Sequence, residues 1–299
     1  MGVEHLTTFA KALNVRETAR LQFEPARSGV VSWNTLAPAG RLRFRLLRAL
    51  TPASAWYDYV EWHPSGRKSF SPQSDRDGVY VDVDVITAQT PFDGIELHGD
   101  GIDFSLLAFS APGRVTPSRA YSGGAPILEV PALSQYVVDG ERGWCSPASL
   151  AMVTSFHAIP TTVEQAAHAV LDRAYNGTGN WSFNTAYAGS LGLRAVVAYL
   201  RNLDHAQRLI ERKLPVIASY SWSEGELPGA PLERSDGHLA VLCGFTPQGD
   251  CAFNDPAAPG VRVVYPREAL EAVWLRNNGV AYVIAPKSID YADILAEPA

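Results

Sequence analysis

Cys145 is the residue whose type and position most favour chemistry. It lies directly before a predicted helix, in the order Trp144-Cys145-Ser146-Pro147, and proline is well tolerated in the first turn of a helix. The positive end of the helix dipole favours the thiolate, which is the nucleophilic form of cysteine. Cysteine is also among the most often buried residue types. Taken alone, Cys145 therefore fits a structural thiol as well as a nucleophile.

A cysteine nucleophile needs a base and a third group that orients the base. His238 opens the apolar strand pattern LAVLCGF, and Asp255 ends the next predicted strand, where Pro256 stops strand pairing. Two adjacent strands would place Asp255 beside His238, where a carboxylate could fix the tautomer of the imidazole. Each residue alone is better explained as a strand-end or turn residue. The three together, in the chain order Cys, His, Asp, predict nucleophilic catalysis.

Several segments of the sequence resemble one known family. They are Trp144–Val153, Gly237–Phe245 and Asn254–Ala257, and Gly179–Ala188 resembles one branch of the same family. The family is the bacteriocin-processing-endopeptidase-like group, family thirty-nine of the cysteine peptidases, which has a papain-like fold. The resemblance covers about Ile127 to Pro286 and implies a cysteine peptidase.

The resemblance also implies a role for each site residue. Cys145 would be the nucleophile, His238 the general base and acid, and Asp255 the orienting residue. Gln135 matches a glutamine of the family that helps to form the oxyanion hole, where one donor contributes about 3–4 kcal/mol. Ser146 stands where glycine is commoner in the family. Bacteriocin-processing members are usually fused to a membrane transporter, which this sequence lacks, so a double-glycine leader substrate is not implied.

Two alternatives to a peptidase stay open. An acyl transferase or amidase could use the same acyl-enzyme on the same fold, because an amine can release it instead of water. A non-catalytic binding module could carry the three residues as a vestige. Zinc binding by the three cysteines with His238 is disfavoured, since Cys243 lies within a strand pattern and no Cys-x-x-Cys spacing occurs. We expect no cofactor and no metal, and a core position for Cys243 and Cys251.

The elements that must position these residues form an α+β pattern, with helices first and a mostly antiparallel sheet after them. Thr161 and Glu164 form a capping-box pattern at the start of the second helix. Helices are predicted over 146–157, 163–172, 181–193, 205–213 and 267–274, and strands over 194–200, 215–222, 238–245, 251–255, 261–265 and 281–286.

The N-terminal part has a different pattern. From Val30 to Phe109, β-branched and aromatic residues alternate with polar residues between short turns, which predicts an all-β sandwich. A Pro-, Gly- and Ser-rich stretch over 111–126 predicts a linker. We therefore expect a β-sandwich domain with its linker over 1–120 and a papain-like cysteine peptidase domain over 127–299. Aromatic side chains of the sandwich either pack in its core or stack on a ligand such as a carbohydrate; they are Trp33, Trp56, Tyr57, Tyr59 and Trp62.

Charge and hydropathy limit the partners. The net charge of −6 gives no electrostatic reason to expect nucleic acid. The apolar runs are far shorter than the roughly 20 residues that span a bilayer, so we expect no membrane partner. The N-terminus lacks a signal-peptide pattern, which predicts a cytoplasmic protein, or a secreted one if a leader has been removed. We expect a peptide or amide substrate, and the sequence leaves the oligomeric state open.

One acidic loop could influence the choice of substrate. Residues 223–237, directly before His238, contain four carboxylates and a single basic residue, Arg234. If this loop faces the substrate, the sequence predicts a preference for cationic over acidic peptides.

Overall fold

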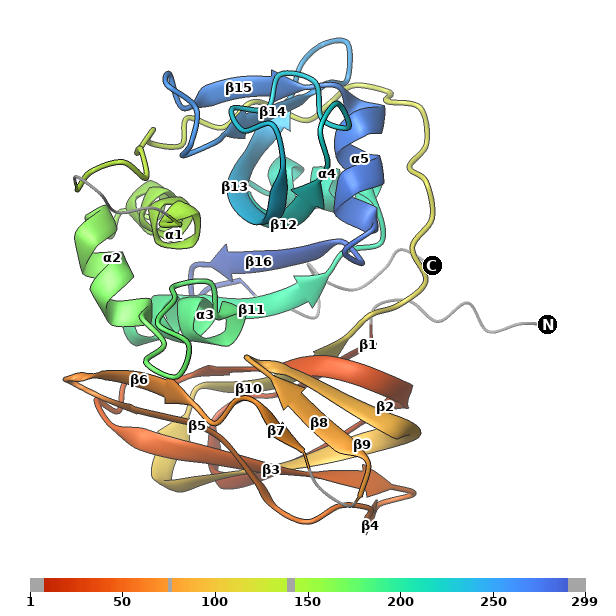
Figure 1. Cartoon of the computed structure of the whole chain (residues 1–299), viewed down its shortest axis with the longest axis vertical. Coiled ribbons are helices and arrows are strands. Elements are labelled where there is room, and N and C mark those ends of the chain that lie inside the picture. The colour runs from red at the N-terminus through yellow and green to blue at the C-terminus, as the bar shows by residue number, and fades with distance from the viewer. Residues whose placement is uncertain (1–7, 75–76, 139–142, 290–299) are drawn as a thin grey trace. The chain divides into compact units, whose positions relative to one another are not determined.

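The computed structural model describes residues 8–74, 77–138 and 143–289. The chain divides into two compact units (Figure 1). The first contains the chain up to Gly113 together with His168–Val197, and the second contains Arg114–Ala167 and the chain from Ala198 onward. No helix within the described ranges is long and apolar enough to cross a membrane.

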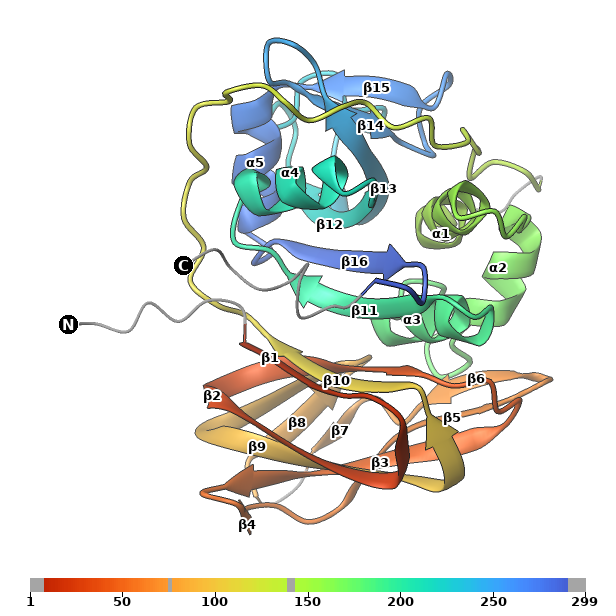
Figure 2. The ribbon, with the colours of Figure 1, turned by 180° about the vertical axis from the view of Figure 1, so that it is seen from behind.

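The first unit is built on one ten-stranded antiparallel sheet (Figure 2). Its strands are paired in the order β1-β10-β2-β9-β3-β5-β6, while β4 pairs with β3 and the β7–β8 pair joins β9. The antiparallel strands predicted from the alternation are thus confirmed, and their arrangement as a sandwich stays a prediction. The elements are β1 (Thr8–Ala12), β2 (Val15–Asn34), β3 (Gly40–Arg48), β4 (Thr51–Pro52), β5 (Tyr57–His63), β6 (Gly66–Ser69), β7 (Gln73–Ser74), β8 (Val79–Asp82), β9 (Val85–Phe104), β10 (Leu106–Ala111) and α3 (Trp181–Ser190).

Most of the aromatic residues proposed for ligand stacking are packed in the core of this unit. Trp33 is 1% exposed, and its ring meets Tyr59 edge-on at 6.5 Å and Trp62 at 5.6 Å. Tyr57 is likewise buried, whereas Trp56 is 40% exposed. These contacts favour the core interpretation for four of the five residues. Carbohydrate binding by them stays a prediction.

Helix α3 and the residues that follow it are joined to strand β2 by buried hydrogen bonds. The Ser182 hydroxyl donates to the carbonyl of Val31 at 2.7 Å. The Asn34 amide donates to the carbonyl of Ala195 and accepts from its N–H, both at 2.9 Å. Buried backbone groups require such partners. The segment 168–197, which the sequence pattern assigns to the C-terminal domain, is therefore anchored to the N-terminal sheet.

The second unit is a layered α/β structure around an antiparallel sheet. Its strands follow the order β16-β12-β13-β14-β15, and each of these pairs is antiparallel. Helix α1 lies on one face of this sheet, and α4 and α5 lie on the other (Figures 1 and 2). The elements are α1 (Cys145–Phe156), α4 (Leu203–Glu211), β12 (Val216–Trp222), β13 (Ser235–Phe245), β14 (Cys251–Asn254), β15 (Arg262–Tyr265), α5 (Arg267–Leu275) and β16 (Val280–Ala285).

Two elements, α2 (Val163–Val170) and β11 (Arg194–Tyr199), continue across the boundaries between the units. Every helix and strand predicted between residues 146 and 286 is present within a few residues of its expected position. Residues 112–126 form neither helix nor strand, as a linker would. The domain boundaries at 120 and 127 stay predictions.

The predicted capping box of α2 is wrong by one residue. The Thr162 hydroxyl accepts from the N–H of Gln165 at 3.1 Å, and the Gln165 side chain accepts from the N–H of Thr162 at 3.0 Å. The Thr161 hydroxyl instead donates to a nearby backbone carbonyl. The sequence offers the pattern twice, as Thr161 with Glu164 and as Thr162 with Gln165. The structure has the second, in which Val163 is the first helical residue and is buried.

We predict that residues 114–299 do not fold alone. Without β2, the buried polar groups of Ser182 and Ala195 would lose their partners, and each loss costs about 1–3 kcal/mol. The fragment should show no cooperative unfolding by circular dichroism. In the whole chain, Asn34→Ala should lower the free energy of unfolding by a similar amount, whereas Gln22→Ala, at an exposed position of the same strand, should not. Cooperative unfolding of the fragment at any temperature would contradict this prediction.

Candidate active site

Helix α1 places Cys145 at its first position, against the central sheet of the second unit. The first ten residues of this helix are all buried. The Ser149 hydroxyl donates to the carbonyl of Leu239 on β13 at 3.1 Å. The hydroxyl of Ser146, at the position where the family more often has glycine, hydrogen-bonds with the Tyr282 hydroxyl at 3.0 Å. These contacts hold the start of the helix, and with it the Cys145 thiol, which is 8% exposed.

His238 lies on β13 and is 2% exposed. Its Nε2 lies 2.9 Å from Oδ1 of Asp255. The imidazole also hydrogen-bonds with Cys145, which leaves Nδ1 as the nitrogen that faces the thiol. Two rings of β12 meet the imidazole edge-on, Tyr220 at 5.8 Å and Trp222 at 5.6 Å. The imidazole is therefore fixed both by its two polar partners and by aromatic packing.

Asp255 follows β14 and has no exposed surface. Its Oδ1 accepts from the N–H of Ala257 at 2.9 Å as well as from His238. Its Oδ2 accepts from the Tyr265 hydroxyl at 2.6 Å and, at 3.5 Å, from the Tyr220 hydroxyl. A buried carboxylate needs such donors to remain charged. Four groups from three strands and a turn thus hold this carboxylate in place.

The charges of the three side chains depend on one another. Burial alone would raise the pKa of the Cys145 thiol, but the hydrogen bond and charge of His238 lower it below its ordinary value. Burial alone would lower the pKa of His238, but its bonds to Asp255 and Cys145 raise it well above the ordinary value. For Asp255, bonds from His238 and Tyr265 outweigh burial and lower the pKa. At pH values between the pKa of Cys145 and the pKa of His238, Cys145 is a thiolate and His238 is an imidazolium.

Gln135 lies beside the turn that carries Asp255. Its backbone N–H donates to the carbonyl of Pro256 at 3.0 Å, and the residue is 5% exposed. Its side-chain Oε1 is buried and has no hydrogen-bond partner among the described residues. The structure thus brings Cys145, His238 and Asp255 into one connected set and joins Gln135 to it through the backbone. The oxyanion role of Gln135 stays a prediction.

Three aromatic residues of the site were missed from the sequence. Tyr220 and Trp222 stand two positions apart on β12, so their side chains share one face, and the strand register pairs Tyr220 with His238. Tyr265 ends β15, next to β14 in the sheet. The alternation on β12 is a usable signal, but the partner of each ring depends on strand order, which one sequence does not reveal.

The other two cysteines are part of the core, as predicted. Cys243 and Cys251 are buried free thiols, and burial raises the pKa of each. Within the ranges that the structure describes, no group of three or more His, Cys, Asp or Glu residues could hold a metal ion.

We predict that His238→Ala raises the pKa of the Cys145 thiol. The substitution removes the hydrogen bond and charge that lower this pKa and leaves the burial that raises it. The rate of alkylation of Cys145 by iodoacetamide, followed by mass spectrometry, should reach half its maximum at a lower pH in the parent chain than in the variant.

His157→Gln, at the other end of α1, provides the control and should leave the profile unchanged. Identical profiles for the parent and His238→Ala, or labelling of the parent only in denaturant, would overturn the assignment.

Comparison with known proteins places the chain in a family. The sequence model of the Peptidase C39-like family matches residues 127–282. The chain is 17% identical to a putative C39-like peptidase from Bacillus anthracis, with a TM-score of 0.43, over 55% of this chain and 99% of that one. No curated protein matches the chain in sequence.

Two further solved structures are similar. One is a double glycine motif protease from an AMS/PCAT transporter in complex with the leader peptide, at 22% identity and a TM-score of 0.37, over 58% of this chain and 97% of that one. The other is the peptidase domain of Streptococcus ComA, a bifunctional ABC transporter, at 18% identity and a TM-score of 0.37, over 52% and 98%. Because the family match spans more than half of the 299 residues, the chain belongs to the Peptidase C39-like family.

Proposed function

We propose that the chain is a cysteine peptidase that cleaves an amide bond through an acyl-enzyme on Cys145. The observation that carries this proposal is the hydrogen-bonded series from Tyr265 through Asp255 and His238 to Cys145. Membership of the Peptidase C39-like family supports it. A vestigial binding module would have no need for a carboxylate held by four donors beside a paired thiol and imidazole.

The geometry supports a two-step reaction. The Cys145 thiolate attacks the carbonyl carbon, the new C–S bond forms, and the carbonyl oxygen takes up the negative charge. As this intermediate collapses, the His238 imidazolium gives its proton to the departing amine, and the acyl group stays on sulfur. The neutral imidazole then takes a proton from a water molecule, which attacks the thioester. Release of the acid regenerates thiolate and imidazolium.

Two donors are proposed for the oxyanion. The N–H of Cys145 is in the first turn of α1, where backbone N–H groups lack partners within the helix and carry the positive end of its dipole. The side-chain amide of Gln135 is the second donor. Its buried position and the bond from its backbone N–H to Pro256, beside Asp255, support this role.

The substrate would be a peptide or another amide. Of the four carboxylates in the loop over 223–237, Glu226 is already paired, since Arg276 donates to it at 2.8 and 2.9 Å. Glu224, Glu233 and Asp236 are exposed. Three remaining carboxylates against Arg234 favour a modest, salt-sensitive preference for basic peptides.

Several finer expectations accompany this proposal. We propose a papain-like arrangement of the second unit, because the helix that carries the nucleophile packs on the antiparallel sheet that carries the base. We also propose that the ten-stranded sheet curls into a sandwich around the packed rings of Trp33, Tyr59 and Trp62. The absence of nucleic-acid and membrane partners, and a cytoplasmic location unless a leader has been removed, stay predictions from the sequence.

We predict that the chain hydrolyses members of a fluorogenic peptide library and that Cys145→Ala abolishes the activity. Gln135→Ala should lower kcat about 100- to 1000-fold, the usual loss for one oxyanion donor. Cys243→Ala, at a buried thiol outside the site, is the matched control and should retain the activity. Among matched peptides, those with Lys near the cleaved bond should be cleaved faster than those with Glu, and high salt should reduce the difference.

The same assay separates the alternatives. Hydrolysis that survives Cys145→Ala would contradict the proposal. An acyl-enzyme that amines release and water does not would instead establish the transferase.

A further inference from the structure

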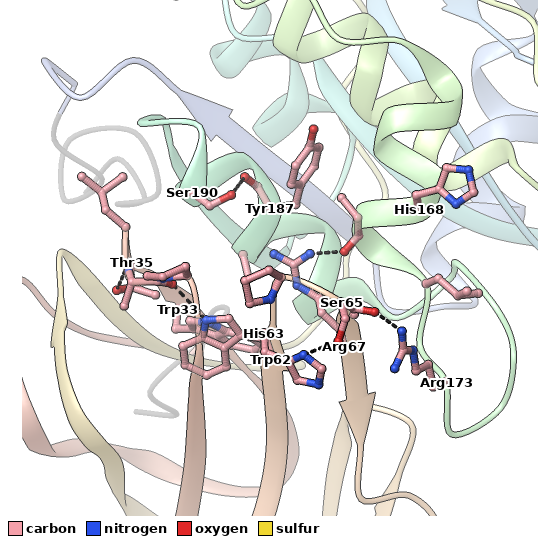
Figure 3. Close-up of a pocket in the computed structure, with 18 residues that line it drawn as sticks. Trp33, Thr35, Trp62, His63, Ser65, Arg67, His168, Arg173, Tyr187 and Ser190 are labelled. Atoms are coloured by element: carbon pink, nitrogen blue, oxygen red, sulfur yellow. Dashed lines mark hydrogen bonds between the residues drawn. The ribbon is translucent and has the colours of Figure 1, made fainter.

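The first unit contains a cavity of about 480 Å³, separate from the residues of the candidate active site (Figure 3). Its walls come from the end of β2, the turn between β5 and β6, and the segment 168–190, all within the first unit. Trp33, Trp62 and Tyr187 contribute aromatic surface. The volume lies within the range of about 300–1,000 Å³ that is typical of sites for small molecules.

The charge of the cavity wall is opposite to that of the whole chain. Arg67 and Arg173 line the cavity together with His63 and His168, and no Asp or Glu is among its lining residues. The chain as a whole has a net charge of −6. Two guanidinium groups without an acid on the same wall attract an anion.

Arg67 is held in place without a carboxylate partner. A terminal nitrogen of its guanidinium donates to the carbonyl of Ala169, and the group lies 5.8 Å from the centre of the Tyr187 ring. Its Nε has no exposed surface and no hydrogen-bond partner among the described residues. Burial lowers the pKa of Arg67 to about 10, because a buried guanidinium has lost part of its hydration. A guanidinium with an unpartnered N–H and no carboxylate on the same wall favours binding of a planar oxyanion such as a carboxylate.

Arg173 lies over the turn between β5 and β6. A terminal nitrogen donates to the carbonyl of Ser65. Gly66, in that turn, has φ = +144°, and a Cβ there would lie 2.6 Å from Nε of Arg173. The glycine therefore serves both the backbone conformation and the space that the guanidinium occupies. Within the described ranges, neither Arg67 nor Arg173 forms an ion pair with a carboxylate.

We propose that this cavity binds a small organic anion, whose carboxylate or phosphate group is held by Arg67 and Arg173 and whose flat apolar body lies against Tyr187 and Trp62. Guanidinium groups bind carboxylate and phosphate oxygens through paired N–H donors. The aromatic surface offers contact to a ring or a similar planar group. The site is independent of Cys145 and of the proposed peptidase activity.

Four probes with the same aromatic ring test the proposal by isothermal titration calorimetry on the whole chain. Benzoate and phenyl phosphate carry the anion, benzyl alcohol is neutral, and benzylamine is cationic. At least one of the two anions should bind with a Kd of about 1 mM or tighter, as expected for a fragment of this size. Benzyl alcohol and benzylamine should bind at least ten-fold more weakly.

Variants then locate the binding. Arg67→Met should weaken anion binding at least ten-fold, whereas Lys68→Met, the next residue on β6, should change it less than two-fold, because successive strand residues face opposite sides. Both variants remove one positive charge. Without a ligand, Arg67→Met should retain or raise the melting temperature, since it removes a poorly compensated buried charge. Arg173→Gln, at an exposed residue, provides a second test if the first variant is unstable.

Three results would overturn the proposal. They are the absence of binding by both anions, benzyl alcohol binding as tightly as the anions, and unchanged anion binding in Arg67→Met or, if that variant does not fold, in Arg173→Gln. The peptidase assay is unaffected by any of them, so failure of this inference is distinguishable from failure of the proposed function.

Discussion

A buried negative charge, that of Asp255, is the constraint on which the site depends. A carboxylate with no exposed surface is costly unless donors surround it. Its donors come from different elements, since Tyr220 is on β12, His238 on β13 and Tyr265 on β15, and the Ala257 N–H belongs to the turn after β14. This arrangement of donors therefore requires the observed order of these strands in the sheet. A sheet with another order would leave the charge unpaired.

The thiolate at Cys145 follows from that carboxylate. Asp255 stabilises the protonated form of His238, and the imidazolium in turn stabilises the thiolate at the start of α1. The helix dipole acts in the same direction. Each charge alone would be disfavoured by burial, and together they form a set in which each member compensates the next.

The second arrangement of charge, around Arg67, follows the opposite principle. Its guanidinium is held by a backbone carbonyl and an aromatic ring and lacks an acidic partner among the described residues. The charges of Cys145, His238 and Asp255 compensate one another, whereas in the proposed anion site the charge of Arg67 is compensated by the bound molecule. The segment 168–197 contributes to that cavity although it lies within the residues that match the family model. Part of the family match therefore belongs to the same compact unit as the N-terminal sheet.

The sequence predicts the elements of the second unit well because their periodicity is local. It also predicts that Cys145, His238 and Asp255 come together, because the pattern places Cys145 at the start of a helix and His238 and Asp255 on adjacent strands, although β13 begins before His238. It does not predict Tyr265 or Tyr220, whose roles depend on strand register. It misplaces the capping box at Thr161, because Thr162 offers the same pattern, and it does not show that Asn34 bonds with Ala195, because that contact joins residues far apart in the chain.

The protonation state of His238 shows whether the buried Asp255 carboxylate stabilises an imidazolium beside Cys145. Nitrogen-15 NMR of the histidine-labelled chain, with His238 assigned by substitution, would show whether one or both ring nitrogens carry a proton at neutral pH. We expect an imidazolium, protonated on both nitrogens, and a lower pKa of His238 in Cys145→Ala, because Cys145 helps to raise the pKa of His238. A neutral imidazole at pH 7 that is insensitive to Cys145→Ala would contradict this expectation.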